Sequence, residues 1–583
     1  MKDFFLVPKP QKLTLEDSNL TFIGIKLAAD NVSIASWLSC IPTGQTPVCF
    51  TRDYSLEKEH YTLIVNQDGI QITYGTDEGA FRACSTLKQI VAQAKDGKIP
   101  CLTIDDYPAI PKRGYLFDFS RGKVAKVAPL KRMIDFLADL KYNELHLYVN
   151  RFGFQFKNFE KYWKDKNAFT PEEIEELDVY CKERFIRLVP NLNSFGHMEA
   201  YTIHEEFSHL AITDNDGKPS HTLNPLLPET LDFVDSIFDG FFDHFSSDVV
   251  HIGMDETTNL GMGETKEACE KYGVGQIYTD FLNKVLKLIR EKYHKTPMFW
   301  ADIVFLHPEQ LKNIPNTSIV MDWGYESEYT FDRNCRTLKE KGLPFYVCPG
   351  TSMWNSYTGR SNNAAFNMHD AALNAQHYGA DGFLLTEWGD GGYPQFFATT
   401  YFPLVFGGSV AWNPWDSYAM TRAKIINDCK KYLDKYIFKS KGEASLGDIV
   451  FRMGNYYLVE DSLYNNGTLC CKYMRRPDKY TPTNSEKKAF QRVIAYMEDL
   501  LKEMDGVEFD AYMRKEITTN CNMVILFSRM LCDDTVTKAE IEELKSTFIE
   551  LWNQENKPYK PGKESFTDAV DNFYAHYLET RTT

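Results

Sequence analysis

The chain has 583 residues, of which 65 are Lys or Arg and 81 are Asp or Glu, so its formal net charge is −16. Apolar residues make up 43% and charged residues 25% of the chain. This composition is ordinary for a globular protein and excludes global disorder, a collagen-like repeat and a small disulfide scaffold. Because the charge is acidic and no long basic run occurs, we do not expect a nucleic-acid partner.

The 13 cysteines are scattered and form no CxxC pair, which is typical of a reducing compartment. Residues 1–12 contain no apolar segment of the kind found in a secretory signal. The longest uncharged run, residues 391–415, is interrupted by prolines, and we interpret it as barrel core and loop rather than a membrane helix. We therefore expect a cytoplasmic protein with no membrane span, or a secreted or periplasmic one if a leader precedes this sequence.

Residues 1–108 predict a small α/β domain. Residues 61–65 and 70–74 are strand-like and flank Asn66-Gln67-Asp68-Gly69, which is typical of a hairpin turn. Residues 78–93 then carry apolar side chains at helical spacing.

Residues 109–425 repeat a different pattern, in which short, mostly apolar segments that end in polar or aromatic residues alternate with helical stretches. Apolar runs of this kind are typical of strands buried in a parallel sheet, and eight such units fit a (β/α)8 TIM barrel. A doubly wound open sheet is the alternative, but no GxGxxG motif follows an early strand. The expected strands are 114–119, 144–149, 184–191, 248–253, 297–301, 318–322, 344–347 and 382–386. The expected helices are 128–140, 171–183, 228–244, 274–293, 331–341 and 364–378.

Residues 426–583 predict a helical C-terminal region. Apolar residues recur at three- and four-residue spacing over 487–504 and 510–532, with charges at the other positions. This region can pack on the barrel, mediate a homodimer or add a wall to a substrate cleft, and the sequence leaves these alternatives open.

Carboxylates and tryptophans follow the expected strands, where a barrel places its active site. Asp255 and Glu256 follow the fourth strand, and Trp300, Trp323 and Trp388 follow the fifth, sixth and eighth. Indole rings can stack on a sugar, and carboxylates can protonate a glycosidic oxygen, so the pattern indicates glycoside hydrolysis.

The adjacency of Asp255 and Glu256 favours one mechanism within that class. Neighbouring side chains point in different directions, so the two carboxylates cannot flank one bond as acid and nucleophile. They suit a substrate-assisted reaction in which a 2-acetamido oxygen attacks C1 and forms an oxazolinium ion. One carboxylate then orients the amide, while the other donates a proton and needs a raised pKa, which we expect burial among Trp rings to supply.

At these positions the sequence resembles glycoside hydrolase family 20, the β-N-acetylhexosaminidases. The resemblance covers residues 60–415, and Tyr148-Val149-Asn150-Arg151 is similar to the family's intracellular-type branch. The matching segments are Arg113 to Arg121, Lys141 to Leu147, Phe195-Gly196-His197, His251-Ile252-Gly253-Met254-Asp255-Glu256 and Trp388-Gly389-Asp390.

The resemblance implies a role for each matching residue. Glu256 is the general acid and then the base, and Asp255 holds the acetamido group. Arg113 and Asp390 contact the distal sugar hydroxyls, and His197 supports the acid by hydrogen bonding. The pocket walls are formed by Trp300, Trp323 and Trp388.

The residue that binds the acetamido oxygen stays open, with Trp354 and Tyr357 as candidates. We expect no cofactor and no metal. The expected substrate is an oligosaccharide or glycoconjugate with a terminal β-linked GlcNAc or GalNAc. The alternatives are a carbohydrate-binding barrel without activity, and a hexosaminidase for a modified hexosamine, such as a sulfated one, with Arg151 or Arg360 near the rim.

Overall fold

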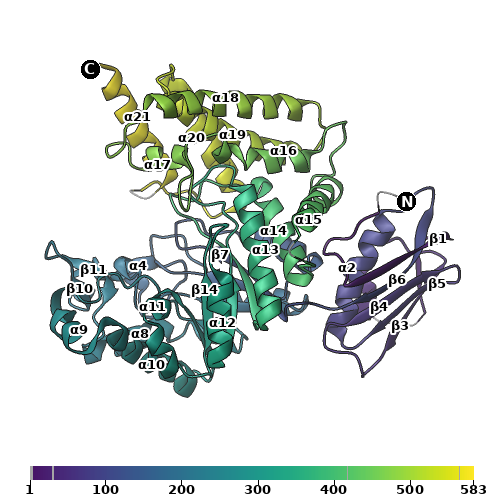
Figure 1. Cartoon of the computed structure of the whole chain (residues 1–583), viewed down its shortest axis with the longest axis horizontal. Helices are drawn as coiled ribbons and strands as arrows, with labels where there is room; N and C mark the ends of the chain where they lie inside the picture. The colour runs from purple at the N-terminus through teal and green to yellow at the C-terminus, as the bar shows by residue number, and fades with distance from the viewer. Residues whose placement is uncertain (1–3, 29–31, 417, 563–564, 583) are drawn as a thin grey trace.

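The computed structural model describes residues 4–28, 32–416, 418–562 and 565–582. It has three parts: a small N-terminal α/β domain, a closed barrel of parallel strands, and a bundle of helices toward the C-terminus (Figure 1). These parts confirm the predicted fold class. The predicted boundary at residues 108 and 109 falls between the N-terminal sheet and the first barrel strand, and the one at 425 and 426 falls inside a helix, α15 (Ala419–Tyr432).

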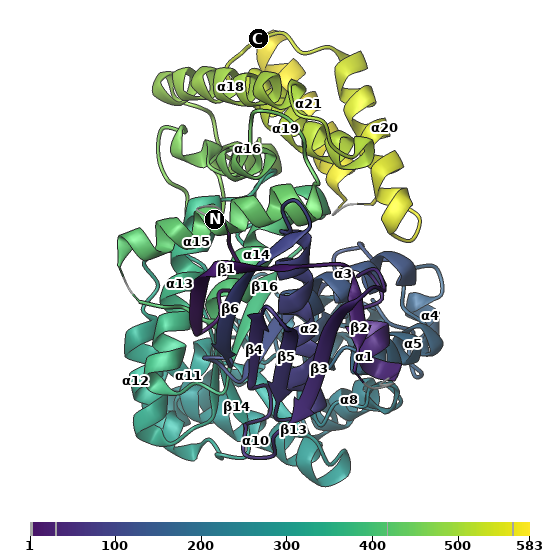
Figure 2. The ribbon, with the colours of Figure 1, turned by 90° about the vertical axis from the view of Figure 1, so that its right-hand side faces the viewer.

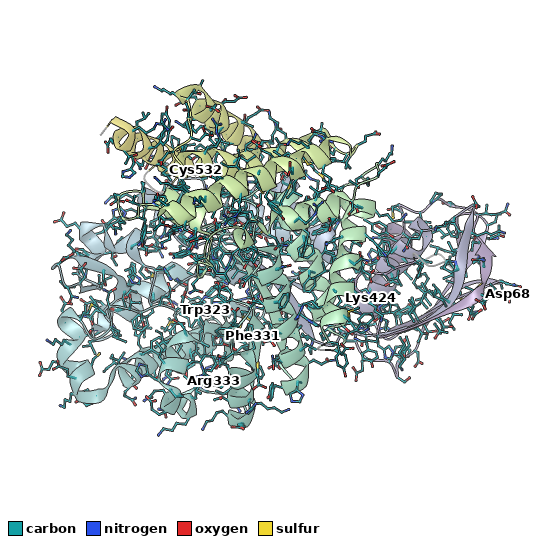
Figure 3. All side chains as sticks on the ribbon, turned by 45° about the horizontal axis from the view of Figure 1, so that its top comes forward. Asp68, Trp323, Phe331, Arg333, Lys424 and Cys532 are labelled. Atoms are coloured by element: carbon teal, nitrogen blue, oxygen red, sulfur yellow. The ribbon has the colours of Figure 1, made fainter. Side chains whose placement is uncertain are left out.

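The N-terminal domain is one mixed sheet in the order β1-β6-β4-β5-β3-β2. Strands β4 and β5 pair antiparallel as the predicted hairpin, and Asp68 at its turn lies at the outer edge of the molecule (Figure 3). Helix α2 lies on the barrel side of the sheet (Figure 1). The elements are β1 (Lys12–Thr21), β2 (Ile25–Leu27), α1 (Val32–Trp37), β3 (Thr46–Arg52), β4 (Tyr61–Asn66), β5 (Gly69–Tyr74), α2 (Asp77–Ala92) and β6 (Lys98–Asp106).

All eight predicted barrel strands are present, and they close in the order β12-β13-β14-β15-β16-β7-β8-β9. Neighbouring strands are parallel, and β16 pairs with β7 to complete the ring. Every residue of β8 and β16 is buried, as expected for strands covered on both faces, and this includes the charged Glu144 and Glu387. The strands are β7 (Lys112–Asp118), β8 (Glu144–Tyr148), β9 (Arg187–Asn191), β12 (Val249–His251), β13 (Thr296–Trp300), β14 (Ile319–Trp323), β15 (Phe345–Cys348) and β16 (Gly382–Glu387).

Helices surround the strands, and the predicted ones are confirmed with one shortened end. The helix expected over 228–244 ends at Phe238, because Gly240 takes a φ of +71° and the backbone leaves the helical conformation there. The longer helices are α3 (Val127–Asp139), α5 (Pro171–Lys182), α8 (Pro228–Phe238), α10 (Val274–Lys292), α12 (Phe331–Lys341), α13 (Ser361–Tyr378) and α14 (Phe397–Trp412). Shorter elements are α4 (Glu160–Trp163), α6 (Glu199–Thr202), α7 (Glu205–Ser208), β10 (Ala211–Thr213), β11 (Pro219–Leu223), α9 (Lys266–Tyr272) and α11 (Asp302–Leu306).

The C-terminal helices stack on one side of the barrel, at the top of Figure 2, and the N-terminal sheet lies on another side, toward the viewer. Helix α19 packs against α14 and α18, so the bundle and the barrel share one hydrophobic core. Among the described residues, no helix is both long and apolar enough to span a bilayer. After α15, the bundle consists of α16 (Leu446–Met453), α17 (Leu469–Arg475), α18 (Asn484–Asp505), α19 (Ala511–Leu531), α20 (Lys538–Glu555) and α21 (Phe566–Thr582).

Candidate active site

A pocket of about 120 Å³ opens at the edge of the barrel where the strands end, and we call it the rim pocket. Trp323, at the end of β14, lies in the central part of the molecule (Figure 3). The position of the pocket is that of the active site in barrel enzymes. Its lining residues are Arg121, Tyr148, His197, Asp255, Glu256, Trp300, Trp323, Tyr325, Trp354, Trp388, Asp390 and Asn466.

A tight turn after β12 brings Asp255 and Glu256 into the rim pocket. Gly253, Met254 and Glu256 all take positive φ, at +72°, +80° and +48°. Such backbone conformations are costly for residues other than glycine and concentrate at functional sites. A Cβ on Gly196 would come within 2.1 Å of the carbonyl oxygen of Asp255, so this glycine permits the close approach of two rim loops.

The side chain of His197 bridges the two carboxylates. Its Nε2 lies 3.3 Å from Oδ2 of Asp255 and 3.1 Å from Oε2 of Glu256. Burial alone would lower the pKa of His197, but the charges and hydrogen bonds of Asp255 and Glu256 raise it to about 10. The imidazole is therefore a cation near neutral pH, and it holds both carboxylates in place.

The structure corrects our expectation for the pKa of Glu256. The hydrogen bond from His197 lowers the pKa of Glu256, and this effect outweighs the opposing effect of burial. The reason is geometric: the Glu256 side chain is 49% exposed, so the tryptophans do not enclose it. A raised pKa occurs instead at Asp302, which accepts a hydrogen bond from the backbone N–H of Glu256 at 2.9 Å. Burial and the charge of Asp255 raise the pKa of Asp302 to about 7.

Three buried polar atoms of the rim-pocket residues have no hydrogen-bond partner among the described residues. They are Oδ1 of Asp255 and the Nε1 atoms of Trp300 and Trp323. Buried polar groups in folded proteins are almost always paired, so an unpaired acceptor and unpaired donors in one pocket indicate a ligand that supplies the missing partners.

The structure contradicts the expectation that Arg113 contacts a sugar. Arg113 lies near the start of β7, at the opposite end of the strand from the rim pocket, and it is 1% exposed. Its guanidinium donates to Glu59 of the N-terminal domain at 2.6 Å and to the backbone carbonyls of Lys141, Ile110 and Pro111 at 2.9 Å. Arg113 therefore joins the N-terminal domain to the barrel.

Arg121, in the same sequence motif but beyond the end of β7, is the arginine that lines the rim pocket. Its guanidinium lies 2.6 Å from Oδ2 of Asp118 and 3.3 Å from Oδ1 of Asp390. It also lies over the rings of Trp388, at 5.4 Å, and Tyr148, at 5.9 Å. Arg121 and Asp390 together form a charged end of the pocket, where they can hold sugar hydroxyls.

The four predicted tryptophans line the rim pocket, but Tyr357 does not. Tyr357 is fully buried between the barrel and the bundle, with its ring against Phe527 and Phe566. Sequence analysis missed Tyr325, whose ring stacks on Trp323 with centroids 5.2 Å apart. The signal was its position two residues after Trp323, just past the end of β14.

The C-terminal region also contributes to the pocket, through Asn466. The side-chain oxygen of Asn466 accepts a hydrogen bond from Nε1 of Trp354 at 3.0 Å, and its backbone N–H donates to Glu326 at 2.7 Å. Glu326 in turn forms a bidentate ion pair with Arg360, at 2.8 and 2.9 Å. The segment around Asn466 is thus fixed to the barrel, and of the three alternatives for the C-terminal region, the structure shows a packed bundle that supplies part of a pocket wall.

Two sets of side chains have the spacing of metal ligands, and both include His197. In the first set, Glu199 forms an ion pair with Arg151 and His221 accepts a hydrogen bond from the backbone N–H of His197. In the second set, His197 bridges Asp255 and Glu256 as described above. Since the protein's own groups account for these contacts, we assign no metal to either set.

Comparison with known proteins identifies the two N-terminal parts of the chain. The glycosyl hydrolase family 20 catalytic domain matches residues 111–381, and domain 2 of the same family matches residues 24–107. The beta-hexosaminidase of Akkermansia muciniphila is 28% identical over 281 residues, which are 42% of this chain and 56% of that protein. The beta-hexosaminidase subunit alpha of Mus musculus is 27% identical over 314 residues, or 49% of this chain and 56% of that protein. The chain thus spans about half the length of these curated relatives.

Solved structures share the fold. The chitobiase of Flavobacterium johnsoniae superimposes with a TM-score of 0.61 at 18% identity, covering 97% of this chain and 98% of that one. The beta-N-acetylhexosaminidase of Bacteroides fragilis superimposes with a TM-score of 0.58 at 16% identity, covering 74% of this chain and 95% of that one. On the evidence of the two matched domains and these relatives, the chain belongs to glycoside hydrolase family 20.

Proposed function

We propose that the protein is a retaining exo-β-N-acetylhexosaminidase that removes terminal β-linked GlcNAc or GalNAc by substrate assistance. The observation that carries the proposal is the pair of adjacent carboxylates in one pocket. Asp255 is buried and has an unpaired oxygen, whereas Glu256 is half exposed at the mouth. The beta-hexosaminidase names of the relatives support the same activity.

In the first step, the acetamido oxygen attacks C1 while the bond from C1 to the leaving oxygen breaks. Glu256 donates its proton to that oxygen, and the product on the enzyme is an oxazolinium ion. The unpaired Oδ1 of Asp255 accepts the acetamido N–H and offsets its developing positive charge. In the second step, Glu256 takes a proton from water, which attacks C1 from the side of the departed group. Two displacements leave the anomeric configuration unchanged.

Glu256 must carry a proton for the first step, although His197 lowers its pKa in the free site. A bound sugar would cover the half-exposed Glu256 carboxyl and remove it from water. Desolvation disfavours the charged form, so substrate binding would raise the pKa of Glu256 toward the range a general acid needs.

The remaining groups of the rim pocket would orient the sugar. Arg121 and Asp390 would hold the hydroxyls farthest from C1, and the tryptophans would enclose the ring. Tyr325 is our candidate for binding the acetamido oxygen, because its hydroxyl lies in the pocket and accepts a hydrogen bond from Trp388 Nε1 at 2.9 Å. A small pocket closed by charged groups suits removal of single terminal residues.

The test is release of 4-nitrophenol from its β-GlcNAc, β-GalNAc and β-glucose glycosides. We expect turnover of the two N-acetyl substrates and not of the glucoside, since glucose lacks the internal nucleophile. The ratio of kcat/KM for the β-GlcNAc and β-GalNAc glycosides measures which configuration of the C4 hydroxyl the enzyme prefers. Glu256→Gln should lower kcat/KM by about 10²–10⁴-fold on a poorly activated substrate such as chitobiose. Glu267→Gln, an exposed residue of α9, is the matched control. Full activity of Glu256→Gln, or equal turnover of the glucoside, would refute the proposal.

A further inference from the structure

A second pocket, of about 260 Å³, adjoins the rim pocket at the junction of the barrel and the bundle. We call it the basic pocket. Helix α17 forms one side of this pocket and lies where the bundle meets the barrel (Figure 1). The lining residues are Asn355, Tyr464, Asn465, Asn466, Thr468, Cys471, Lys472, Arg475, Arg476 and Tyr480.

Three cations line the basic pocket: Lys472, Arg475 and Arg476. In the part of the chain that the structure describes, none of them forms an ion pair with a carboxylate. The Lys472 ammonium lies over the rings of Tyr464 and Tyr480, at 4.9 and 4.4 Å from their centroids. Aromatic faces attract a cation without using its N–H donors, so those donors stay available.

This arrangement is unusual for so acidic a chain, whose net charge is −16. The two arginines that sequence analysis raised for a modified sugar are neutralised: Arg151 pairs with Glu199, and Arg360 pairs with Glu326. Three clustered cations without carboxylate partners repel one another, and an anion bound between them would relieve that repulsion.

The basic pocket meets the rim pocket at the end that would hold the distal sugar hydroxyls. Asn466 lines both pockets. Nδ2 of Asn355 lies 3.5 Å from Oδ2 of Asp390, and the Oδ1 of Asn355 accepts a hydrogen bond from Arg475. Arg475 also packs on the backbone next to Asp390, since its Cδ lies 3.3 Å from where a Cβ of Gly391 would be.

We propose that the basic pocket binds a sulfate or phosphate ester on C6 of the terminal hexosamine. The inference rests on the proposed function, which places the non-reducing end of the sugar against Asp390. C6 is exocyclic, so an ester there reaches farther from the ring than an ester on a ring hydroxyl. Lysine and arginine side chains donate charge-assisted hydrogen bonds to tetrahedral oxyanions.

The first test compares kcat/KM for three substrates of the full chain: 4-nitrophenyl β-GlcNAc, its 6-sulfate and its 6-phosphate. We expect at least one ester to exceed the unsubstituted glycoside by about tenfold or more, because each hydrogen bond to a charged group is worth about that factor. The better ester identifies the anion. This preference should shrink as ionic strength rises. A preference for the unsubstituted glycoside over both esters would overturn the proposal.

The second test assigns the preference to the basic pocket. The quantity to compare is the ratio of kcat/KM for the better ester to kcat/KM for the unsubstituted glycoside. Lys472→Met and Arg475→Met should each lower this ratio several-fold. Lys479→Met, at an exposed position just beyond the pocket, should leave the ratio unchanged. Arg476→Gln is an additional variant, because Arg476 is exposed and its loss would not disturb folding. A ratio that survives in all three pocket variants would overturn the assignment.

A binding measurement separates this inference from the proposed function. Calorimetry measures the Kd values of GlcNAc, GlcNAc 6-sulfate and GlcNAc 6-phosphate, and it does not depend on hydrolysis. Tighter binding of an ester that depends on Lys472 would support the inference even if no glycoside were hydrolysed. Equal Kd values for all three sugars would overturn it even if hydrolysis were observed.

Discussion

Two arginines flank the same barrel strand and act in opposite ways. Arg113, at the start of β7, is buried and donates to Glu59 and to three backbone carbonyls. Arg121, beyond the end of β7, lies in the rim pocket between Asp118 and Asp390. The comparison teaches that the end of the strand matters. A charged residue at the start of a barrel strand can join domains, whereas one beyond its carboxyl end lies where a substrate would bind.

The largest expected effect lies at the structural end. Arg113→Met should reduce the free energy of unfolding by about 3–5 kcal/mol, because it leaves the buried Glu59 carboxylate with Arg82 as its remaining cation. Urea denaturation of the variant beside the parent protein measures this loss. The KM of the folded variant for 4-nitrophenyl β-GlcNAc should stay within about twofold of the parent value. A raised KM with unchanged stability would show that Arg113 contacts the sugar instead.

The ion pair between Arg113 and Glu59 should stabilise the protein in a pH-dependent way. Burial opposes ionisation of Glu59, but Arg113 and Arg82 together lower its pKa from 4.5 to about 2. A lowered pKa in the folded state means that this ion pair stabilises the protein above pH 4.5 and ceases to do so as the pH falls toward 2. The stability difference between the parent and Arg113→Met should therefore narrow over this interval in denaturation curves recorded at several pH values.

The next effect concerns catalysis at the pocket end. Asp255→Asn should lower kcat/KM for 4-nitrophenyl β-GlcNAc by about 10²–10³-fold, since an amide cannot offset the charge that develops on the acetamido group. Oδ1 of Asp255 has no partner to lose, but the substitution also removes the charge that Oδ2 presents to His197, so thermal unfolding should be measured beside the kinetics. A loss of less than tenfold would show that Asp255 does not stabilise the oxazolinium ion.

Arg121→Met sharpens the comparison directly. We expect KM for 4-nitrophenyl β-GlcNAc to rise about 10–100-fold, because one charge-assisted contact to the distal hydroxyls is removed. Steady-state kinetics beside Arg113→Met provide the contrast: one arginine should affect mainly KM and the other mainly stability. If both variants changed KM alike, the division between the two ends of the strand would be wrong.

The smallest effect is a displacement of the pH profile. His197 lowers the pKa of Glu256, so it limits the alkaline range in which Glu256 carries the proton it must donate. His197→Gln removes that charge, and the alkaline limb of kcat/KM should move to higher pH while kcat falls by about tenfold. An unmoved limb combined with a lower kcat would indicate that His197 only positions the carboxylates.

Much of the fold could be predicted from the sequence because buried parallel strands have a plain signature. The runs that became β8 and β16 are mostly apolar, although they include Glu144, His146 and Glu387, and every residue in them is buried. The predicted helix over 228–244 was too long because the spacing of apolar residues continues past Gly240, where the backbone turns.

The candidate site was predictable where its residues follow a barrel strand closely, as the four tryptophans and the Asp255-Glu256 pair do. Asp255 and Glu256 come from a single turn, so their adjacency in sequence is also adjacency in space. The prediction that Arg113 contacts the sugar was wrong, because its motif contains two arginines, Arg113 and Arg121, at opposite ends of one strand. Asn466 was missed because its place in the pocket depends on long-range packing through Glu326 and Arg360, which no local pattern encodes.

The attachment of Asn466 to the barrel has a consequence for dividing this protein into modules. A fragment that ended after the last barrel strand would keep the two carboxylates but lose Asn466, the partner of Trp354, together with all the cations of the basic pocket. On the role that we propose for the basic pocket, exchanging residues 464–480 would change the preference for esterified sugars while the eight strands stay the same. The residues that set this preference and the residues that carry out the reaction would then lie in separate segments of the chain.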